Sequence, residues 1–229
     1  MISSGFLSVL VLAGTHLFAN RQKVLGWVWH GQFLSFASGV SLAYVFVDLL
    51  PALAKGAPVL KRAFDPLVPF LELHTYLIAL LGILFYYGVQ PLSFSKKHQW
   101  LSLSSYLLFN FLIGAALSDS LNPEIQPLTL FTIAIGLHYF IRDHEVKIFR
   151  SNLLMALSVF SLFIGYGTGY ISKIPDAAAA TGISFVSGGI LLNTLKFLSP
   201  TKGLEGYFWF VFGALLYTGI LLSVGEVKF

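Results

Sequence analysis

The chain has 229 residues, of which 56% are hydrophobic and only 10% are charged, and its mean hydropathy is +0.80. A water-soluble domain carries about 25% charged residues, so this composition excludes a soluble globular protein and indicates an integral membrane protein. The formal net charge of +4 is small, and in a membrane protein it reports loop orientation rather than affinity for nucleic acid. The absence of cysteine excludes disulfides and thiolate metal ligands.

Apolar segments of helical length recur along the whole chain. A helix needs about 20 residues to cross a hydrocarbon core of about 30 Å, and the alternating pattern of a membrane barrel is absent. We therefore predict an all-α fold in which residues 1–229 form a single integral membrane domain with eight transmembrane helices. The predicted helices cover residues 5–19, 32–52, 73–92, 101–118, 127–145, 151–172, 178–198 and 206–225.

Lysine and arginine residues are distributed unevenly between the two sides of this predicted bundle. Nine of the 14 lie in the loops that follow the odd-numbered helices or at the ends of these helices, and the other five lie on the opposite side. Cytoplasmic loops carry the excess of positive charge. The sequence therefore predicts that both termini lie outside, and the setting that we expect is a bacterial inner (plasma) membrane.

Two segments resemble each other within the second and seventh predicted helices. Residues 35–39 read SFASG and residues 184–188 read SFVSG, and a proline follows the phenylalanine by fifteen positions in both cases (Pro51 and Pro200). Weak self-similarity of this kind is the sequence signature of an inverted repeat in transporters. Chance is the alternative, because Ser, Gly and Phe are common in membrane helices. A repeat would make these two helices partners and would place the fourth and fifth helices on the pseudo-axis.

Most polar side chains within apolar segments lie in the fourth and fifth predicted helices. Asn110 lies within the segment 106–117, and His138 lies within the segment 128–141. Polar groups are expensive in a bilayer and usually face a bundle interior or a pathway. The segment 128–141 has fourteen residues, about 21 Å of helix, and an unusually short hydrophobic segment often marks a transport site. We therefore expect the site between these two helices.

Several short motifs resemble those of the ZIP family of divalent-metal transporters. They are the sequence DLLP at residues 48–51, Asn110 followed by Gly114, the single His138 of the fifth helix, and the Ser-Gly pair at residues 187–188. The resemblance extends over nearly the whole chain. It implies eight helices in a 3+2+3 arrangement with inverted symmetry and both termini outside. It also implies a metal centre between the fourth and fifth helices, usually for zinc, iron or manganese.

The chain departs from the family motifs at several positions of this centre. The fourth helix of the family carries His-Asn-x-x-Asp-Gly, and here Phe109 and Ile113 stand at the His and Asp positions. The fifth helix carries His-Glu-x-Pro-His-Glu or a variant. Tyr139, Ile141 and Arg142 stand here at the Glu, Pro and second His positions. The predicted metal site therefore keeps only part of the family's donor set.

The metal ligands that we predict are His138 and Asn110 as direct donors, with Asp143 and Asp48 as carboxylates in or near the path. Zinc usually takes four ligands, so an amide and an imidazole would need these carboxylates, carbonyl groups or water. Arg142 is always charged. It either occupies the place of the metal, paired with a carboxylate, or extends to the cytosolic interface.

The resemblance implies transport of a divalent metal cation across the membrane. The alternative is a non-transporting relative, a scaffold or regulatory protein whose metal site is lost. Transport needs a wet, ligand-lined gap between the fourth and fifth helices, whereas a lost site would have this gap closed by Phe109, Ile113 and an ion pair of Arg142. Transport of another solute would need a wider polar cavity.

The sequence also bears on enzyme activity and on binding partners. No serine triad, glycine-rich phosphate loop or pair of carboxylates at catalytic spacing is present, so we expect no enzyme activity, no catalytic residue and no cofactor. The expected partners are the transported metal ion, with zinc as one candidate, and the lipid bilayer, without nucleic acid. A homodimer is an open alternative. His16 and Asn193 are expected to make interhelical hydrogen bonds rather than to bind metal.

Overall fold

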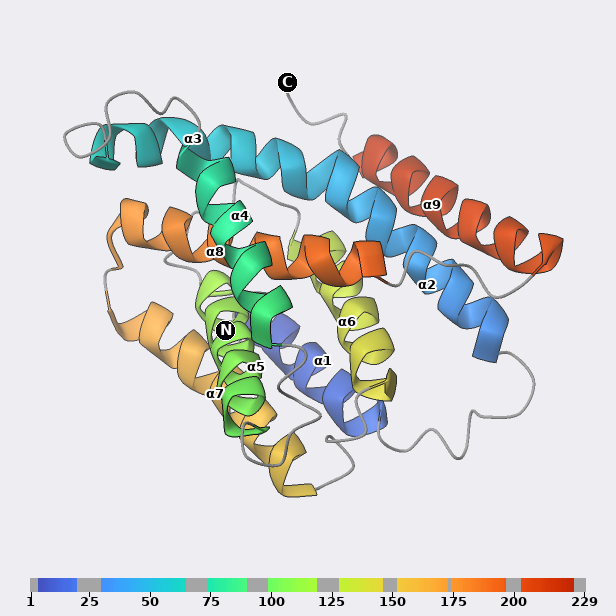
Figure 1. Cartoon of the computed structure of the whole chain (residues 1–229), viewed down its shortest axis with the longest axis horizontal. Helices are drawn as coiled ribbons and strands as arrows, with labels where there is room; N and C mark the ends of the chain where they lie inside the picture. The colour runs from blue at the N-terminus through green and yellow to red at the C-terminus, as the bar shows by residue number, and fades with distance from the viewer. Residues whose placement is uncertain are drawn as a thin grey trace.

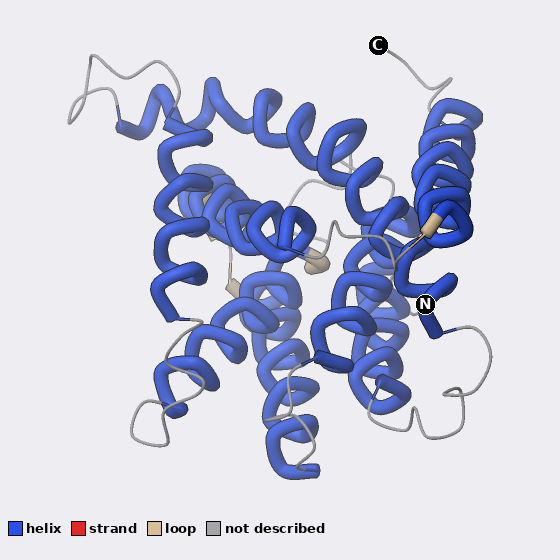
Figure 2. The backbone as a smooth tube through the Cα atoms, turned by 45° about the vertical axis from the view of Figure 1, so that its right-hand side comes forward, coloured by secondary structure: helices blue, strands red, loops and turns tan. Residues whose placement is uncertain are grey.

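The computed structural model describes residues 4–19, 30–64, 74–89, 99–118, 128–145, 152–172, 174–196 and 203–224. These residues form eight helical segments joined in part by short turns, and they include no strand (Figure 2). The predicted all-α fold class is therefore confirmed. The helices are α1 (Ser4–Ala19), α2 (His30–Tyr44), α3 (Leu50–Phe64), α4 (His74–Val89), α5 (Gln99–Ala116), α6 (Leu128–Glu145), α7 (Asn152–Ile171), α8 (Asp176–Lys196) and α9 (Leu204–Val224).

Helices α2 and α3 form one continuous helical segment, joined by the π-helical turn Val45–Leu49. The segment therefore continues to Phe64, beyond the predicted end at residue 52. Two leucines spaced seven residues apart, Leu53 and Leu60, are buried on one face of α3. Because residues seven apart lie on one side of a helix, this packing supports the extra helical turns.

Four of the described helices are long and apolar enough to cross a membrane, judged by their length and composition. They are Gly31–Phe64, Leu153–Ile171, Asp176–Lys196 and Leu204–Ser223. Four shorter apolar helices accompany them, namely Ser4–Leu17, His74–Val89, Trp100–Ala116 and Leu128–Phe140. Together with the composition, these helices indicate a membrane protein.

The helices fall into two groups in space (Figure 1). Helices α1, α5, α6 and α7 lie mostly in the lower half of the view and are called the α5 group. Helices α2, α3, α4, α8 and α9 lie in the upper half and are called the α8 group. The most extensive helix pairs are α2 with α9, α5 with α7, α4 with α8, and α1 with α6. Each of these pairs lies within one group, so the two groups meet through fewer contacts.

Glycines bring the backbones of three helix pairs into contact. A Cβ atom on Gly39 would collide with the carbonyl oxygen of Phe210 on α9, and a Cβ atom on Gly213 would collide with that of Phe36 on α2. The carbonyl belongs in each case to the residue three positions before the partner's glycine. The same reciprocal arrangement joins α4 to α8 and α5 to α7, through the pairs Gly82 with Gly188 and Gly114 with Gly165.

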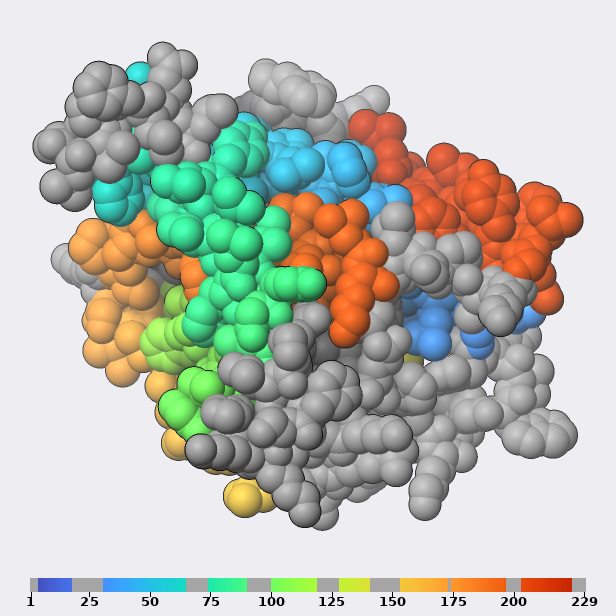
Figure 3. Space-filling model, in the orientation of Figure 1, coloured from blue at the N-terminus to red at the C-terminus, as the bar shows by residue number. Residues whose placement is uncertain are grey.

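This close approach is how membrane helices associate when no hydrophobic driving force acts between them. The absence of a side chain lets a Cα–H group reach the facing carbonyl, which adds a weak hydrogen bond. Helices α2 and α9 run side by side in the same direction (Figure 1). In the space-filling view, α4 lies against α8 on the face toward the viewer (Figure 3). The glycines therefore fix which helices are neighbours around the centre.

Candidate functional site

Buried polar side chains form two hydrogen-bonded groups, one within the α5 group of helices and one between the two helix groups. His16 comes from α1, Tyr106 and Asn110 come from α5, His138 comes from α6, and Asn193 comes from α8. None of these side chains is more than 5% exposed. Tyr106 and Asn110 are four residues apart and therefore share one face of α5. The two direct donors predicted from the sequence, His138 and Asn110, belong to different hydrogen-bonded groups.

The imidazole of His16 is hydrogen bonded at both ring nitrogens. Its Nε2 lies 3.0 Å from Oδ1 of Asn110, and its Nδ1 lies 3.2 Å from the hydroxyl oxygen of Tyr106. The amide nitrogen of Asn110 donates to the carbonyl oxygen of Tyr106 at 3.0 Å. The ring of Tyr139 lies against the imidazole, with 4.2 Å between ring centroids. The predicted interhelical hydrogen bond of His16 is confirmed, and its partner is Asn110.

His138 contacts the other helix group. Its Nε2 lies 3.5 Å from Nδ2 of Asn193 on α8, a long hydrogen bond between two buried side chains. The ring of Phe109 on α5 stacks on the imidazole, with 6.0 Å between centroids and 28° between the planes. The predicted interhelical hydrogen bond of Asn193 is therefore confirmed as well. The polar residues of α5 and α6 thus bond to α1 and α8, respectively.

The hydrogen-bond partners assign opposite tautomers to the two histidines. Oδ1 of Asn110 can only accept, so Nε2 of His16 carries the proton, whereas Nδ2 of Asn193 can only donate, so Nε2 of His138 is unprotonated. We expect ¹⁵N NMR of the histidine-labelled protein to show an Nε2–H form for His16 and an Nδ1–H form for His138. Because the chain has six histidines, the variants His16→Gln and His138→Gln are each needed to assign the signals that they remove. The same tautomer at both residues would contradict these amide orientations.

The remaining predicted ligands lie elsewhere or outside the described side chains. Asp48 is buried in the π-helical turn, and the hydroxyl of Tyr217 on α9 donates to its Oδ2 at 3.4 Å. Asp143 and Arg142 lie in the last turns of α6, but their side chains lie outside the described residues. In the part of the chain that the structure describes, no group of three or more His, Cys, Asp or Glu residues could hold a metal ion.

The π-helical turn around Asp48 was not predicted from the sequence. The backbone N–H of Leu50 bonds to the carbonyl of Val45, five residues earlier, where an α-helix would use a carbonyl four residues earlier. Such turns often occur at functional sites. The Tyr217 contact joins residues 169 positions apart, and no signal in the sequence linked them.

Aromatic and aliphatic side chains pack tightly beside His138. Phe109 is fully buried, and Ile113 is 2% exposed. The Phe109 ring lies 5.8 Å from the ring of Tyr86 and 6.1 Å from that of Tyr139, measured between centroids. A Cβ atom on Gly189 of α8 would collide with the Tyr86 ring. The centre is therefore densely packed beside the two histidines.

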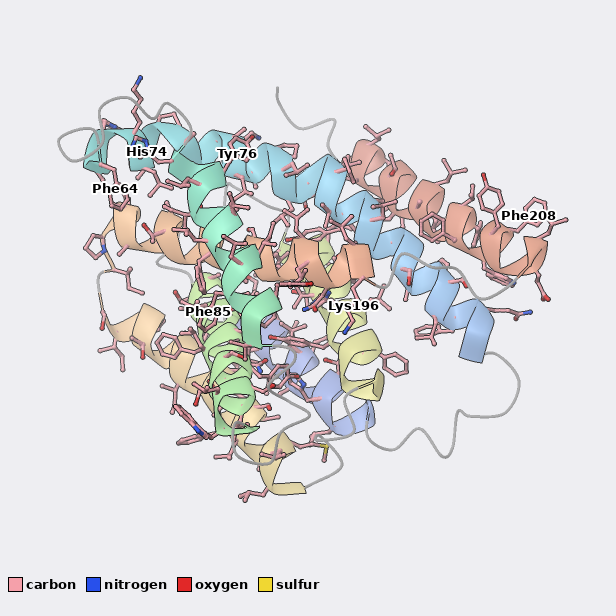
Figure 4. All side chains as sticks on the ribbon, viewed as in Figure 1. Phe64, His74, Tyr76, Phe85, Lys196 and Phe208 are labelled. Carbon is pink, nitrogen blue, oxygen red and sulfur yellow. The ribbon has the colours of Figure 1, made fainter. Side chains whose placement is uncertain are left out.

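A third buried histidine, His74, begins α4. It lies beside Phe64 at the end of α3 (Figure 4), and the two rings stack with 6.0 Å between centroids. This contact connects the end of the long α2–α3 segment to the next helix. Phe109 and Asn193, which contact His138, come instead from α5 and α8.

Comparison with known proteins gives no match to a protein-family model, to a curated protein or to a solved structure. The composition and the helices define the class as a helical membrane protein. Within that class, the distinguishing feature is two buried imidazole–amide pairs, His16 with Asn110 and His138 with Asn193.

Proposed function

We propose that this chain is a ZIP-like membrane transporter that moves a divalent metal cation, with zinc, iron and manganese as candidates. The observation that carries the proposal is the buried imidazole of His138, whose Nε2 faces the amide of Asn193 across the junction of the two helix groups. Neutral imidazole nitrogen is a common ligand of these metals. Asn110, Asp48 and Asp143 complete the proposed set of path residues, and the proposed location is a bacterial inner membrane with both termini outside.

The helix pairs support the 3+2+3 arrangement that this proposal includes. An inverted repeat would exchange α1 with α7, α2 with α8, α4 with α9, and α5 with α6. Under this exchange, the pair α2–α9 corresponds to the pair α8–α4. The pair α5–α7 corresponds in the same way to the pair α6–α1. All four are among the most extensive pairs of the fold. It also converts the contact of α2 with α6 into that of α8 with α5, and both contacts are present.

The similar segments at residues 35–39 and 184–188 also occupy similar surroundings. Gly39 packs on the backbone of α9, and Gly188 packs on the backbone of α4, which the proposed repeat exchanges. Ser38 and Ser187 each donate to the carbonyl oxygen four residues earlier, at 2.8 and 2.7 Å. These two pairs of matching positions support the proposed repeat.

One observation favours the second candidate function, a non-transporting relative that serves as a scaffold or regulator. Phe109 and Ile113 are buried at the positions where the family motif has metal donors. In a transporter, these side chains would belong to a closed conformation and would have to move aside. In a scaffold, they would be a permanent part of the core.

Uptake by reconstituted protein separates the two functions. The full chain is placed in proteoliposomes, and uptake of Zn²⁺, Mn²⁺, Fe²⁺ and Cd²⁺ is compared with that of protein-free liposomes. Saturable uptake of at least one cation is the expected result. If folded protein moves none of the four, the transport proposal fails and the scaffold function is favoured.

A further inference from the structure

We infer that Asn193 is itself a metal ligand, contributed by α8 and paired with Nε2 of His138. In the structure its amide donates to that nitrogen, and after a half-turn of the amide group Oδ1 would take the place of Nδ2. The imidazole nitrogen and the amide oxygen would then face the same point. The inference rests on the proposed function and extends it by a donor that neither the sequence motifs nor the α5–α6 junction supplies.

The spacing of the two atoms fits a shared cation. Two ligand atoms at about 2.1 Å from a tetrahedral zinc ion lie about 3.4 Å apart. Nε2 of His138 and Nδ2 of Asn193 are 3.5 Å apart, whereas an ordinary N–H hydrogen bond is about 2.9–3.0 Å long. The two side chains are therefore already at chelating distance. The amide has to turn so that its O and N atoms exchange places, and the imidazole has to tilt so that its lone pair points at the cation instead of at the amide.

The surroundings hold these two side chains in place and keep lipid away. His138 is 4% exposed and Asn193 is 5% exposed, and the Phe109 ring covers one face of the imidazole. Gly189, one helical turn before Asn193, allows the ring of Tyr86 to approach α8. A cation at this point would thus be enclosed by aromatic rings.

The next residue of α8 also carries a buried polar group. The hydroxyl of Thr194 is buried and has no hydrogen-bond partner among the described residues. A buried hydroxyl without a partner costs about 1–3 kcal/mol, and such groups often bond to internal water. An internal water molecule would provide this bond, on a side of α8 about 100° around the helix from Asn193.

The donor types define the class of cation. An imidazole nitrogen and an amide oxygen suit Zn²⁺, Co²⁺, Fe²⁺ and Mn²⁺, whereas Ca²⁺ and Mg²⁺ prefer sets of oxygen ligands rich in carboxylate. Both donors are neutral, so the site binds weakly, which favours release during transport. Because His138 and Asn193 belong to different helix groups, the bound cation would also join the two groups.

The test uses Co²⁺ as a spectroscopic probe on the full chain in nanodiscs. Asn193→Asp keeps the shape of the side chain and makes the donor anionic, so we expect Co²⁺ to bind at least about tenfold more tightly with an altered d–d absorption spectrum. Asn193→Leu removes the donor and should weaken binding by about 10–100-fold, the range seen when groups that support a metal are lost. Ser187→Ala on the same helix, whose hydroxyl donates to the carbonyl of Ile183, is the matched control and should bind as the wild type does.

The outcomes distinguish this inference from the proposed function. If the wild type binds Co²⁺ and the Asn193 variants leave the affinity or the spectrum unchanged, Asn193 is not a ligand, while the transport proposal stands. If the wild type binds neither Co²⁺ nor Zn²⁺, this inference fails, and uptake in proteoliposomes decides the transport proposal separately. If the variants fail to fold, a measurement on the wild type alone still tests the inference. Zn²⁺ should shift the ¹³Cγ resonance of Asn193 together with the ¹⁵Nε2 resonance of His138, and a shift of His138 alone overturns the inference.

Discussion

Replacing Gly165 with alanine is expected to destabilise the folded protein by about 3 kcal/mol, at the upper end of the cost of overpacking. The added Cβ would collide with the carbonyl oxygen of Phe111 on α5. Because the obstacle is backbone rather than a flexible side chain, it cannot rotate away, so α5 and α7 must separate. The measurement is the shift of the unfolding midpoint in detergent, followed by circular dichroism.

Gly167 provides the matched control on the same helix. A Cβ at this position has nothing within 4 Å, and alanine is favoured over glycine in a helix by about 1 kcal/mol. Gly167→Ala should therefore leave stability unchanged or raise it slightly. Equal destabilisation by the two replacements would show that α5 and α7 do not pack as described. The other five glycines of the reciprocal pairs should behave like Gly165, namely Gly39, Gly82, Gly114, Gly188 and Gly213.

The second prediction concerns transport. His138→Ala should lower the initial rate of cation uptake by at least about tenfold in proteoliposomes, because it removes the buried imidazole that we propose as the central ligand. His138→Gln, which preserves much of the volume, should also lose uptake if the nitrogen ligand matters. A loss with alanine that glutamine restores would instead indicate a packing role for this residue.

The control for the second prediction is a buried polar residue away from His138. Ser158 on α7 is 1% exposed, and its hydroxyl bonds the carbonyl oxygen of Leu154 at 2.9 Å. Ser158→Ala should retain uptake near the wild-type rate. Unchanged uptake in folded His138→Ala would overturn the role of His138 as a ligand.

The sequence predicted the helices well because each one is a long apolar run bounded by polar or charged residues. The described helices overlap all eight predicted segments. Composition alone was sufficient to indicate a membrane protein, since a chain with so few charged residues cannot form the charged surface of a water-soluble protein. The interhelical bonds of His16 and Asn193 were predictable because a polar group in an apolar helix needs a partner.

The partners themselves were not predictable from the sequence. His16 bonds Asn110 from 94 positions away, and His138 bonds Asn193 from 55 positions away. Helices in a bilayer are apolar on the lipid-facing side as well as on the buried side, so the pattern of a soluble amphipathic helix is lost. The buried face cannot then be read from periodicity.

The glycines illustrate the same limit. The sequence places glycines at 165, 167 and 169 with equal spacing. The structure shows that Gly165 and Gly169 face α5, whereas Gly167 faces open space. Nothing in their spacing distinguishes the structural positions from the neutral one, because the distinction depends on where α5 lies.

The unbroken path of helix from Gly31 to Phe64 has a mechanical consequence. Its 34 residues correspond to about 51 Å of length, well beyond a hydrocarbon core of about 30 Å. Unless the segment tilts strongly, one end projects past the lipid tails, and α3 carries the exposed charges of Lys55, Lys61 and Arg62. By this geometry, a rotation at the Asp48 turn would produce its largest displacement at the tip of the segment, where Phe64 meets His74.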